Sequence, residues 1–132
     1  MNAFAIRDSI ETSLEKAELV FTFRWDEQAR ASADAADACR KAHCGSPYLG
    51  VSVTVKDNFD VKGYPTTAGS RLLAKTPTAK CDAAVVRRLR RAGLVMLGRT
   101  NMTEFAYSGL GLNPHFGTPL NPAFPGEQRI PG

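Results

Sequence analysis

Lys56 is the residue of this chain whose type and position most suggest chemistry. It ends the apolar run GVSVTV at residues 50–55 and is followed directly by Asp57. A lysine is rarely buried unless it is paired or functional, and desolvation favours its neutral form. A neutral lysine at the end of a core strand can act as a general base, and it then needs a nucleophile, normally a serine, within hydrogen-bond reach. The plainer alternative is that Lys56 is only the exposed end of a strand.

The other groups that could do chemistry give weaker signals. His115 lies in the Pro/Gly-rich stretch NPHFGTP, and we interpret it as a loop residue rather than a catalyst. Cys39 and Cys44 bracket His43, but this spacing matches no zinc signature and a fourth ligand is missing. Three cysteines without regular spacing do not form a disulfide framework either. We therefore expect no metal site and no cofactor.

Composition and charge exclude several classes of protein. The chain has 132 residues, of which 43% are hydrophobic and 23% charged, so it is typical of one globular domain rather than of a disordered chain. A net charge of +4 is too small to indicate nucleic acid by itself. The cluster RRLRR at residues 87–91 is typical of a solvated helix face. A nucleic-acid-binding module is the alternative that this cluster leaves open, and we expect no nucleic-acid partner.

The N-terminus carries early charges and has no apolar core region, so it does not resemble a signal peptide. No run approaches the roughly 18 apolar residues that indicate a membrane span. We expect a cytoplasmic protein without a membrane partner.

The segments around Lys56 have the pattern of an α/β unit. Residues 51–55 alternate valine with Ser or Thr, which predicts a strand. Residues 82–92 form an amphipathic pattern that predicts a helix, capped by Asp82 and stopped by Gly93. The nearly all-apolar run at 94–98 predicts a strand buried on both faces.

The first third of the chain is predicted to be mainly helical. Apolar spacing predicts a helix over 5–17 and an alanine-rich helix over 26–44, with Asp26 as its N-cap and Gly45 as its C-cap. The run LVFTF at 19–23 suits either an extended link or a last helical turn.

After the second strand, a capping-box-like pattern of Thr100 and Glu104 predicts a short helix over 100–109. The segment 109–132 is rich in proline and glycine and shows no periodicity. Together with the small predicted core, it suggests that these elements are the first part of a larger sheet, in a chain that is cut short.

Five motifs follow one another in a fixed order between Gly50 and Gly132. They are V-K-D, T-T-A-G-S, A-A-V-V-x-x-L-x-x-A-G, G-x-T-N-M-x-E-F-A and N-P-x-x-G-T-P. In this order they resemble the amidase signature family. The resemblance implies an α/β fold with a mixed sheet flanked by helices. It makes residues 1–132 the N-terminal portion of a single amidase domain, with a helical lead-in at 1–45 and the start of the signature core at 50–132.

The resemblance also implies a mechanism, a Ser–cis-Ser–Lys triad that hydrolyses carboxylic amide bonds. Lys56 matches the catalytic lysine of the V-K-D motif, and we expect it to be buried so that it is not permanently protonated. The family's two serines lie in a segment of the G-G-S-S-G type, and no serine of this chain does. We therefore expect the chain alone to be inactive. The loops next to the motifs suggest substrate-binding roles for Thr67, Gly69, Tyr107 and Ser108.

Three functions remain open at this point. The first is an amidase acting on a small-molecule amide in the complete protein, with this chain supplying Lys56. The second is an inactive fragment or pseudoenzyme with a structural role. The third is the A subunit of a glutamyl-tRNA amidotransferase, which shares the same motifs.

Overall fold

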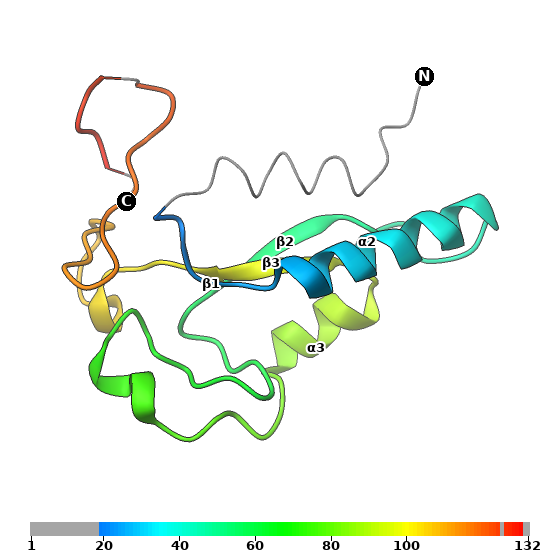
Figure 1. The fold of residues 1–132 in the computed structure, drawn as a ribbon, viewed down its shortest axis with the longest axis horizontal. Helices are drawn as coiled ribbons and strands as arrows, with labels where there is room; N and C mark the ends of the chain where they lie inside the picture. Colours follow the sequence, from blue (N-terminus) through cyan, green and yellow to red (C-terminus); the bar gives the residue numbers. More distant parts are fainter. Residues whose placement is uncertain (1–18, 125, 131–132) are drawn as a thin grey trace.

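A computed structural model describes residues 19–124 and 126–130 of the chain (Figure 1). The helix expected over 5–17 lies outside the described residues. The elements follow in the order β1 (Phe21–Arg24), α2 (Asp26–Lys41), β2 (Ser52–Lys56), the 3-10 helix η1 (Leu72–Lys75), α3 (Ala84–Arg91), β3 (Val95–Thr100) and the 3-10 turn η2 (Glu104–Ala106).

The three strands form one mixed sheet in the order β1-β3-β2. β2 runs parallel to the central strand β3, with Lys56 opposite Thr100, and β1 runs antiparallel to β3 on its other side. Every residue of β3 except Thr100 is buried, as its apolar sequence predicts for a strand covered on both faces. The α/β class with a mixed sheet and flanking helices is confirmed.

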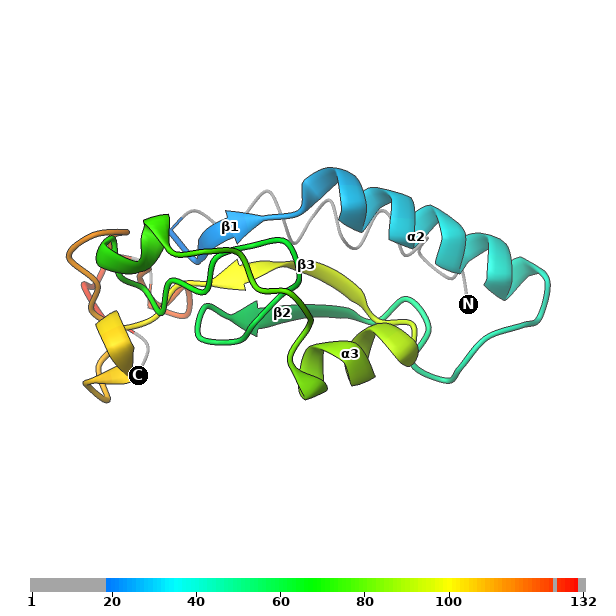
Figure 2. The same ribbon diagram turned by 90° about the horizontal axis from the view of Figure 1, so that it is seen from below.

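The two helices pack on opposite faces of the sheet (Figure 2). Ala29, Ala33 and Ala36 lie on one face of α2 and pack against Val95 and Leu97 of β3. Alanine allows the helix to approach the strand closely, although each contact buries little area. The alanine pattern of this helix therefore has a packing explanation.

α3 covers the other face of the sheet with a single fully buried side chain, Val86. Val86 belongs to the same buried cluster as Val55 of β2 and Met96 of β3. Since neighbouring residues of a strand point to opposite faces, Met96 faces α3 while its neighbours in β3 face α2. The arginines of α3 at positions 87, 88, 90 and 91 are mostly exposed, as a solvated helix face requires.

The expected N-caps of both helices are wrong. The N-cap position of α2 is Trp25, and Asp26 pairs instead with the Arg24 guanidinium at 2.8 and 2.9 Å. The N-cap position of α3 is Ala83, and the Asp82 carboxylate accepts hydrogen bonds from the Lys62 amide and from Arg90. Both carboxylates bind partners that a cap rule does not consider.

α2 also ends earlier than the expected Gly45 cap. Its last residue is Lys41, and His43 takes the left-handed conformation with φ 54°. The Cys44 amide then donates to the Cys39 carbonyl at 2.9 Å, which closes the helix end. A histidine thus occupies the position where glycine is commonest.

Two segments without a regular helix complete the described fold. The run at 19–23 contributes to β1, so the lead-in at 1–45 is not wholly helical. The helix expected over 100–109 is wrong, because Thr100 ends β3 and only Glu104–Ala106 form a 3-10 turn. Phe105 and Ala106 have φ of 54° and 56°, values that interrupt a right-handed helix.

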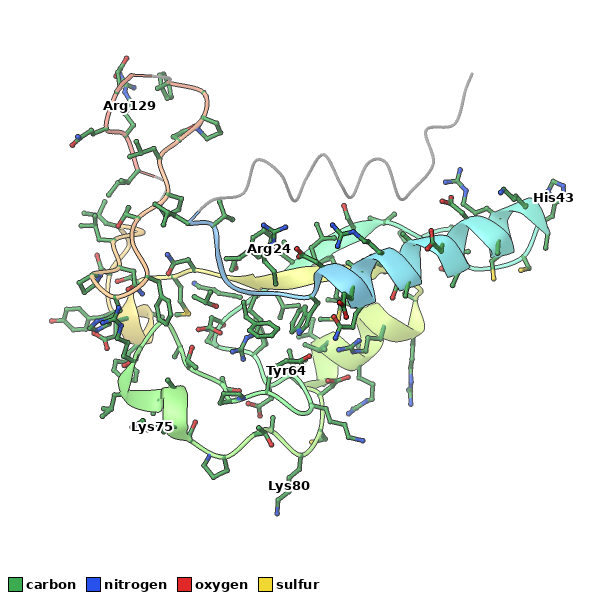
Figure 3. The ribbon with its side chains drawn as sticks, viewed as in Figure 1. Arg24, His43, Tyr64, Lys75, Lys80 and Arg129 are labelled. Carbon is green, nitrogen blue, oxygen red and sulfur yellow. The ribbon has the colours of Figure 1, made fainter. Side chains whose placement is uncertain are left out.

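A long connection leads from β2 to α3 and carries η1. Figure 3 shows Lys75 and Lys80 on the outer side of this connection, whereas Tyr64 lies toward the body of the molecule. The Tyr64 ring meets the Trp25 ring edge-on, with 5.5 Å between their centres. Across the described residues, no helix has both the length and the hydrophobicity needed to cross a membrane.

Candidate active site

Lys56 is the last residue of β2, as predicted, and borders a pocket at the C-terminal end of the parallel strands. This pocket, which we call the Lys56 pocket, has a volume of about 120 Å³. Its wall is formed mainly by the segment that follows β3. The lining includes Asn101, Met102, Thr103, Ser108, Leu110 and Pro119.

The expectation that Lys56 is buried is wrong, because its side chain is exposed. Side chains alternate along a strand, and the residues on either side, Val55 and Asp57, are the buried ones. Lys56 therefore points away from the core and toward the Lys56 pocket. Desolvation of its amine would require a further segment to cover this pocket.

Asp57 is the buried charge at this position, and it is paired. Its Oδ1 lies 3.0 Å from Nε of Arg99, and the two side chains are 0% and 4% exposed. This contact is an ion pair without hydrogen-bond alignment. The other carboxylate oxygen, Oδ2, accepts hydrogen bonds from the Thr67 hydroxyl and, at 3.1 Å, from the Gly69 amide. A charged carboxylate that is buried without such partners would be strongly unfavourable.

Thr67 and Gly69 therefore contact Asp57, the residue next to Lys56, and neither lines the Lys56 pocket. Gly69 has φ 68°, and a Cβ atom there would lie 2.7 Å from the Met102 carbonyl oxygen. Only glycine combines a left-handed backbone conformation with so close an approach to the backbone of Met102. Both residues hold the wall of the pocket in place.

Asn113 holds the same wall from the other side. Its Nδ2 donates to the carbonyl oxygens of Gly69 and Met102 at 2.8 and 2.7 Å. Its Oδ1 accepts from the amides of His115 and Phe116 at 2.8 and 3.0 Å. One buried amide side chain thus ties three loops together around the Lys56 pocket.

Ser108 is the predicted substrate-binding residue that the structure brings into the Lys56 pocket. Its Oγ accepts a hydrogen bond from the Leu110 amide at 3.1 Å, so its own hydroxyl hydrogen can still be donated. Tyr107, its neighbour, is 93% exposed and lies outside the lining of this pocket. The four expected residues are therefore divided between the Lys56 pocket, its supporting wall and the open surface.

A polar cluster supports the turn that leads to Ser108. Nε2 of His115 lies 3.1 Å from Oε1 of Glu104, which makes His115 a packed loop residue, as expected. The hydrogen bond from the buried Ser70 hydroxyl is the main cause that lowers the pKa of Glu104; burial opposes it, and His115 lowers the pKa further. Glu104 is therefore held in its charged form.

Sequence reasoning missed three of these supporting residues: Arg99, Asn113 and Asp57 in its buried role. A signal was present for the first, because an arginine inside the apolar run LVMLGRT needs a buried acid as partner. No local signal identifies Asn113, whose partners lie 44 and 11 residues away.

The fold and this site define a class. A pair of parallel strands carries a lysine at its C-terminal end, next to a buried Asp–Arg pair. The loops held by Asp57 and Asn113 surround this lysine's pocket. The family model described as Amidase matches residues 5–132, and the chain belongs to this family.

Two curated relatives show how much of a family member the chain represents. It is 45% identical over 103 residues to the AtzE subunit of 1-carboxybiuret hydrolase from Pseudomonas sp. (strain ADP), a match that covers 77% of this chain and 22% of that protein. It is 50% identical over 96 residues to the A subunit of glutamyl-tRNA(Gln) amidotransferase from Halorhodospira halophila, with 73% and 20% covered. The chain thus spans about a fifth of the length of these relatives.

Solved structures agree with this assignment. The fold superposes with a TM-score of 0.82 and 39% identity on a structure described as a vestigial protein complex that reveals the origins of an s-triazine catabolic enzyme. This superposition covers 92% of this chain and 28% of the other. A second structure, of an amidase, matches with a TM-score of 0.78 and 35% identity, covering 95% and 30%.

Proposed function

We propose that the protein hydrolyses the C–N bond of a small-molecule carboxylic amide and that Lys56 is the base of the reaction. The observation that carries this proposal is the position of Lys56 in the lining of the Lys56 pocket, in a chain of the amidase family. Lys56 acts in this proposal through a Ser–cis-Ser pair that lies outside this chain. The nucleophilic serine attacks the amide carbonyl and passes its proton through the second serine to Lys56. The proton returns to the leaving nitrogen as the C–N bond breaks, which releases the amine and leaves an acyl-enzyme; water then hydrolyses the acyl-enzyme and releases the acid.

The surroundings of Lys56 support a base rather than a structural ion pair. The residues that line the Lys56 pocket include no carboxylate, so within the described chain its wall offers the lysine no counter-ion. The nearby carboxylate of Asp57 is already committed to Arg99, Thr67 and Gly69. A lysine without an acidic partner loses its proton more easily once it is desolvated.

Because Lys56 is exposed in this chain, the segment that carries the serines has a second role in this proposal. In this proposal, that segment covers the Lys56 pocket, removes water from the amine and brings the nucleophile within reach. In this proposal the Lys56 pocket is only part of the active site, because the serines come from the covering segment. The 132-residue chain is therefore expected to be inactive by itself.

A second candidate is an amidotransferase subunit, favoured by the 50% identity to such a protein. Both candidates share amide cleavage and differ in what receives the released ammonia. A third, an inactive fragment with a structural role, requires no turnover at all.

One experiment separates the three candidates. A complete amidase is assembled from this chain and the remaining part of a relative such as AtzE, and ammonia release from a panel of small amides, including glutamine, is measured. Hydrolysis of small amides without other components supports the amidase. Release from glutamine only in the presence of glutamyl-tRNA and the other subunits supports the amidotransferase. No release under any condition, with the fold intact by circular dichroism, contradicts both and favours the inactive fragment.

A further inference from the structure

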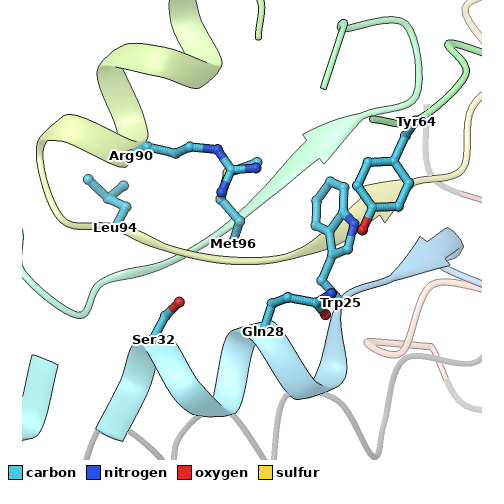
Figure 4. Close-up of a pocket in the computed structure, with 7 residues that line it drawn as sticks. All are labelled: Trp25, Gln28, Ser32, Tyr64, Arg90, Leu94 and Met96. Atoms are coloured by element: carbon cyan, nitrogen blue, oxygen red, sulfur yellow. The ribbon is translucent and has the colours of Figure 1, made fainter. Parts of the chain in front are cut away.

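A second pocket lies where α2, α3 and β3 come together, and no lining residue is shared with the Lys56 pocket (Figure 4). We call it the Trp25 pocket; its volume is about 80 Å³. Five of its lining side chains can donate hydrogen bonds: Trp25, Gln28, Ser32, Tyr64 and Arg90. The mechanism proposed above uses none of them.

Trp25 supplies the observation that points to a ligand. Its side chain belongs to the core, with the residue only 4% exposed, and its indole nitrogen finds no acceptor among the described residues. An indole N–H is a donor only, and buried donors without a partner are rare because each loses its hydrogen bonds to water without replacement. The ring cannot simply turn away, because it packs edge-on against Tyr64 at 5.5 Å and lies 6.0 Å from Phe23.

The charge of the Trp25 pocket favours an anion. Among the residues that the structure describes, Arg90 is the one charged residue of its lining, and no carboxylate lines it. Asp82 pairs with Arg90 through Nε at 3.0 Å, so the terminal amino groups of the guanidinium remain able to donate. In Figure 4 the Arg90 guanidinium extends toward the centre of the pocket, while Trp25 and Tyr64 lie on the opposite side.

The remaining wall and the size of the pocket narrow the class of ligand. Leu94 and Met96 give the Trp25 pocket an apolar side. Its volume exceeds the roughly 10–15 Å³ needed for one water and suits a molecule of a few heavy atoms. We propose that the Trp25 pocket binds a short-chain monocarboxylate such as acetate or propionate. The carboxylate accepts hydrogen bonds from Trp25 and Arg90, and the alkyl group lies against Leu94 and Met96.

Trp25 makes this proposal directly measurable, because it is the only tryptophan of the chain. The 132-residue chain is titrated with sodium acetate and sodium propionate at constant ionic strength, with sodium chloride as the matched salt. Tryptophan fluorescence and the single indole N–H resonance in the NMR spectrum report on binding. Saturable changes in both signals with the carboxylates, and a downfield shift of the N–H resonance, are expected. Signals that stay unchanged, or that change equally with chloride, overturn the proposal.

Two variants test the assigned contacts. Arg90→Gln is expected to weaken carboxylate binding at least about tenfold, as the loss of a charge-assisted hydrogen bond does. Arg88→Gln is the control, since Arg88 is exposed on the same helix and does not line the Trp25 pocket. Undiminished binding to Arg90→Gln overturns the proposal.

A neutral ligand tests the charge of the bound molecule. Acetamide has the size of acetate without its charge, and we expect it to bind at least about tenfold more weakly, since it lacks the charge-assisted hydrogen bond to Arg90. Equal binding would overturn the assignment of an anion. Should Arg90→Gln unfold by circular dichroism, the comparison of acetate with acetamide on the unchanged chain still decides the matter.

Discussion

The carboxylate of Asp57 and the guanidinium of Arg99 form a buried ion pair, with Oδ1 and Nε 3.0 Å apart. Asp57 follows the last residue of β2, and Arg99 is the fifth residue of β3. The pair thus joins the two parallel strands next to Lys56. Because Asp57 also binds Thr67 and Gly69, the same carboxylate ties the 67–69 loop to the end of β2.

We expect Asp57→Asn to be strongly destabilising. The substitution leaves the Arg99 charge buried without compensation, a situation that typically costs about 3–5 kcal/mol. Asp26→Asn is the matched control, because Asp26 forms an exposed ion pair with Arg24, and such pairs contribute about 0–1 kcal/mol. Urea denaturation of the two variants measures the difference. Equal free energies of unfolding would show that the buried pair does not hold the strands.

Gly98 allows β1 to approach the centre of the sheet. A Cβ atom at this position would lie 2.4 Å from the Phe23 carbonyl oxygen and 2.7 Å from the Phe21 ring. Gly98→Ala is therefore expected to destabilise the protein by about 1–3 kcal/mol through overpacking. Gly109→Ala serves as control, since no atom lies within 4 Å of a Cβ there. Thermal melts of both variants test this, and an equally small loss in both would contradict the close packing of β1.

The stability of the Glu104 cluster is expected to fall in acid. The pKa of Glu104 is lowered mainly by the Ser70 hydroxyl and further by His115. A carboxyl whose folded-state pKa is depressed contributes stability that is fully present above its unfolded-state pKa and is lost as the pH falls through the folded-state pKa. Titration of the Glu104 carboxyl carbon by NMR measures this pKa.

Ser70→Ala removes the main cause and is expected to raise the pKa of Glu104 toward its ordinary value. Ser52→Ala, on the exposed side of β2, is expected to leave it unchanged. If the pKa of Glu104 is the same in both variants, the hydrogen bond from Ser70 to Glu104 is wrongly assigned.

The parts of the fold that could be predicted are those set by local pattern. The alternating valines before Lys56 and the apolar run 94–98 identify β2 and β3, because a period of two and full burial leave clear marks in sequence. Local pattern could not show whether residues 19–23 form a strand or a last helical turn. The pairing of β1 joins Phe21 to Thr100, far along the chain, so no local window contains the partner.

The errors at the helix ends and at Lys56 have related causes. Asp26 and Asp82 have the right residue type for a cap, yet each binds an arginine instead. Lys56 was expected inside because it follows an apolar strand, but the alternation of the strand puts Val55 and Asp57 inside. The strand pattern placed Lys56 at the end of β2 as predicted, and the alternation of side chains along the strand decided which way it points.

The catalytic role of Lys56 is tested most directly in a complete amidase built on this chain. Lys56→Ala is compared with Lys62→Ala, a change at an exposed lysine that does not line the Lys56 pocket. The rate of amide hydrolysis is measured for both, with circular dichroism as the check on folding. Loss of the base is expected to lower turnover at least about 10²-fold in Lys56→Ala, while Lys62→Ala remains within about twofold of the parent. A folded Lys56→Ala enzyme with near-parental turnover would contradict the assignment of Lys56 as the base.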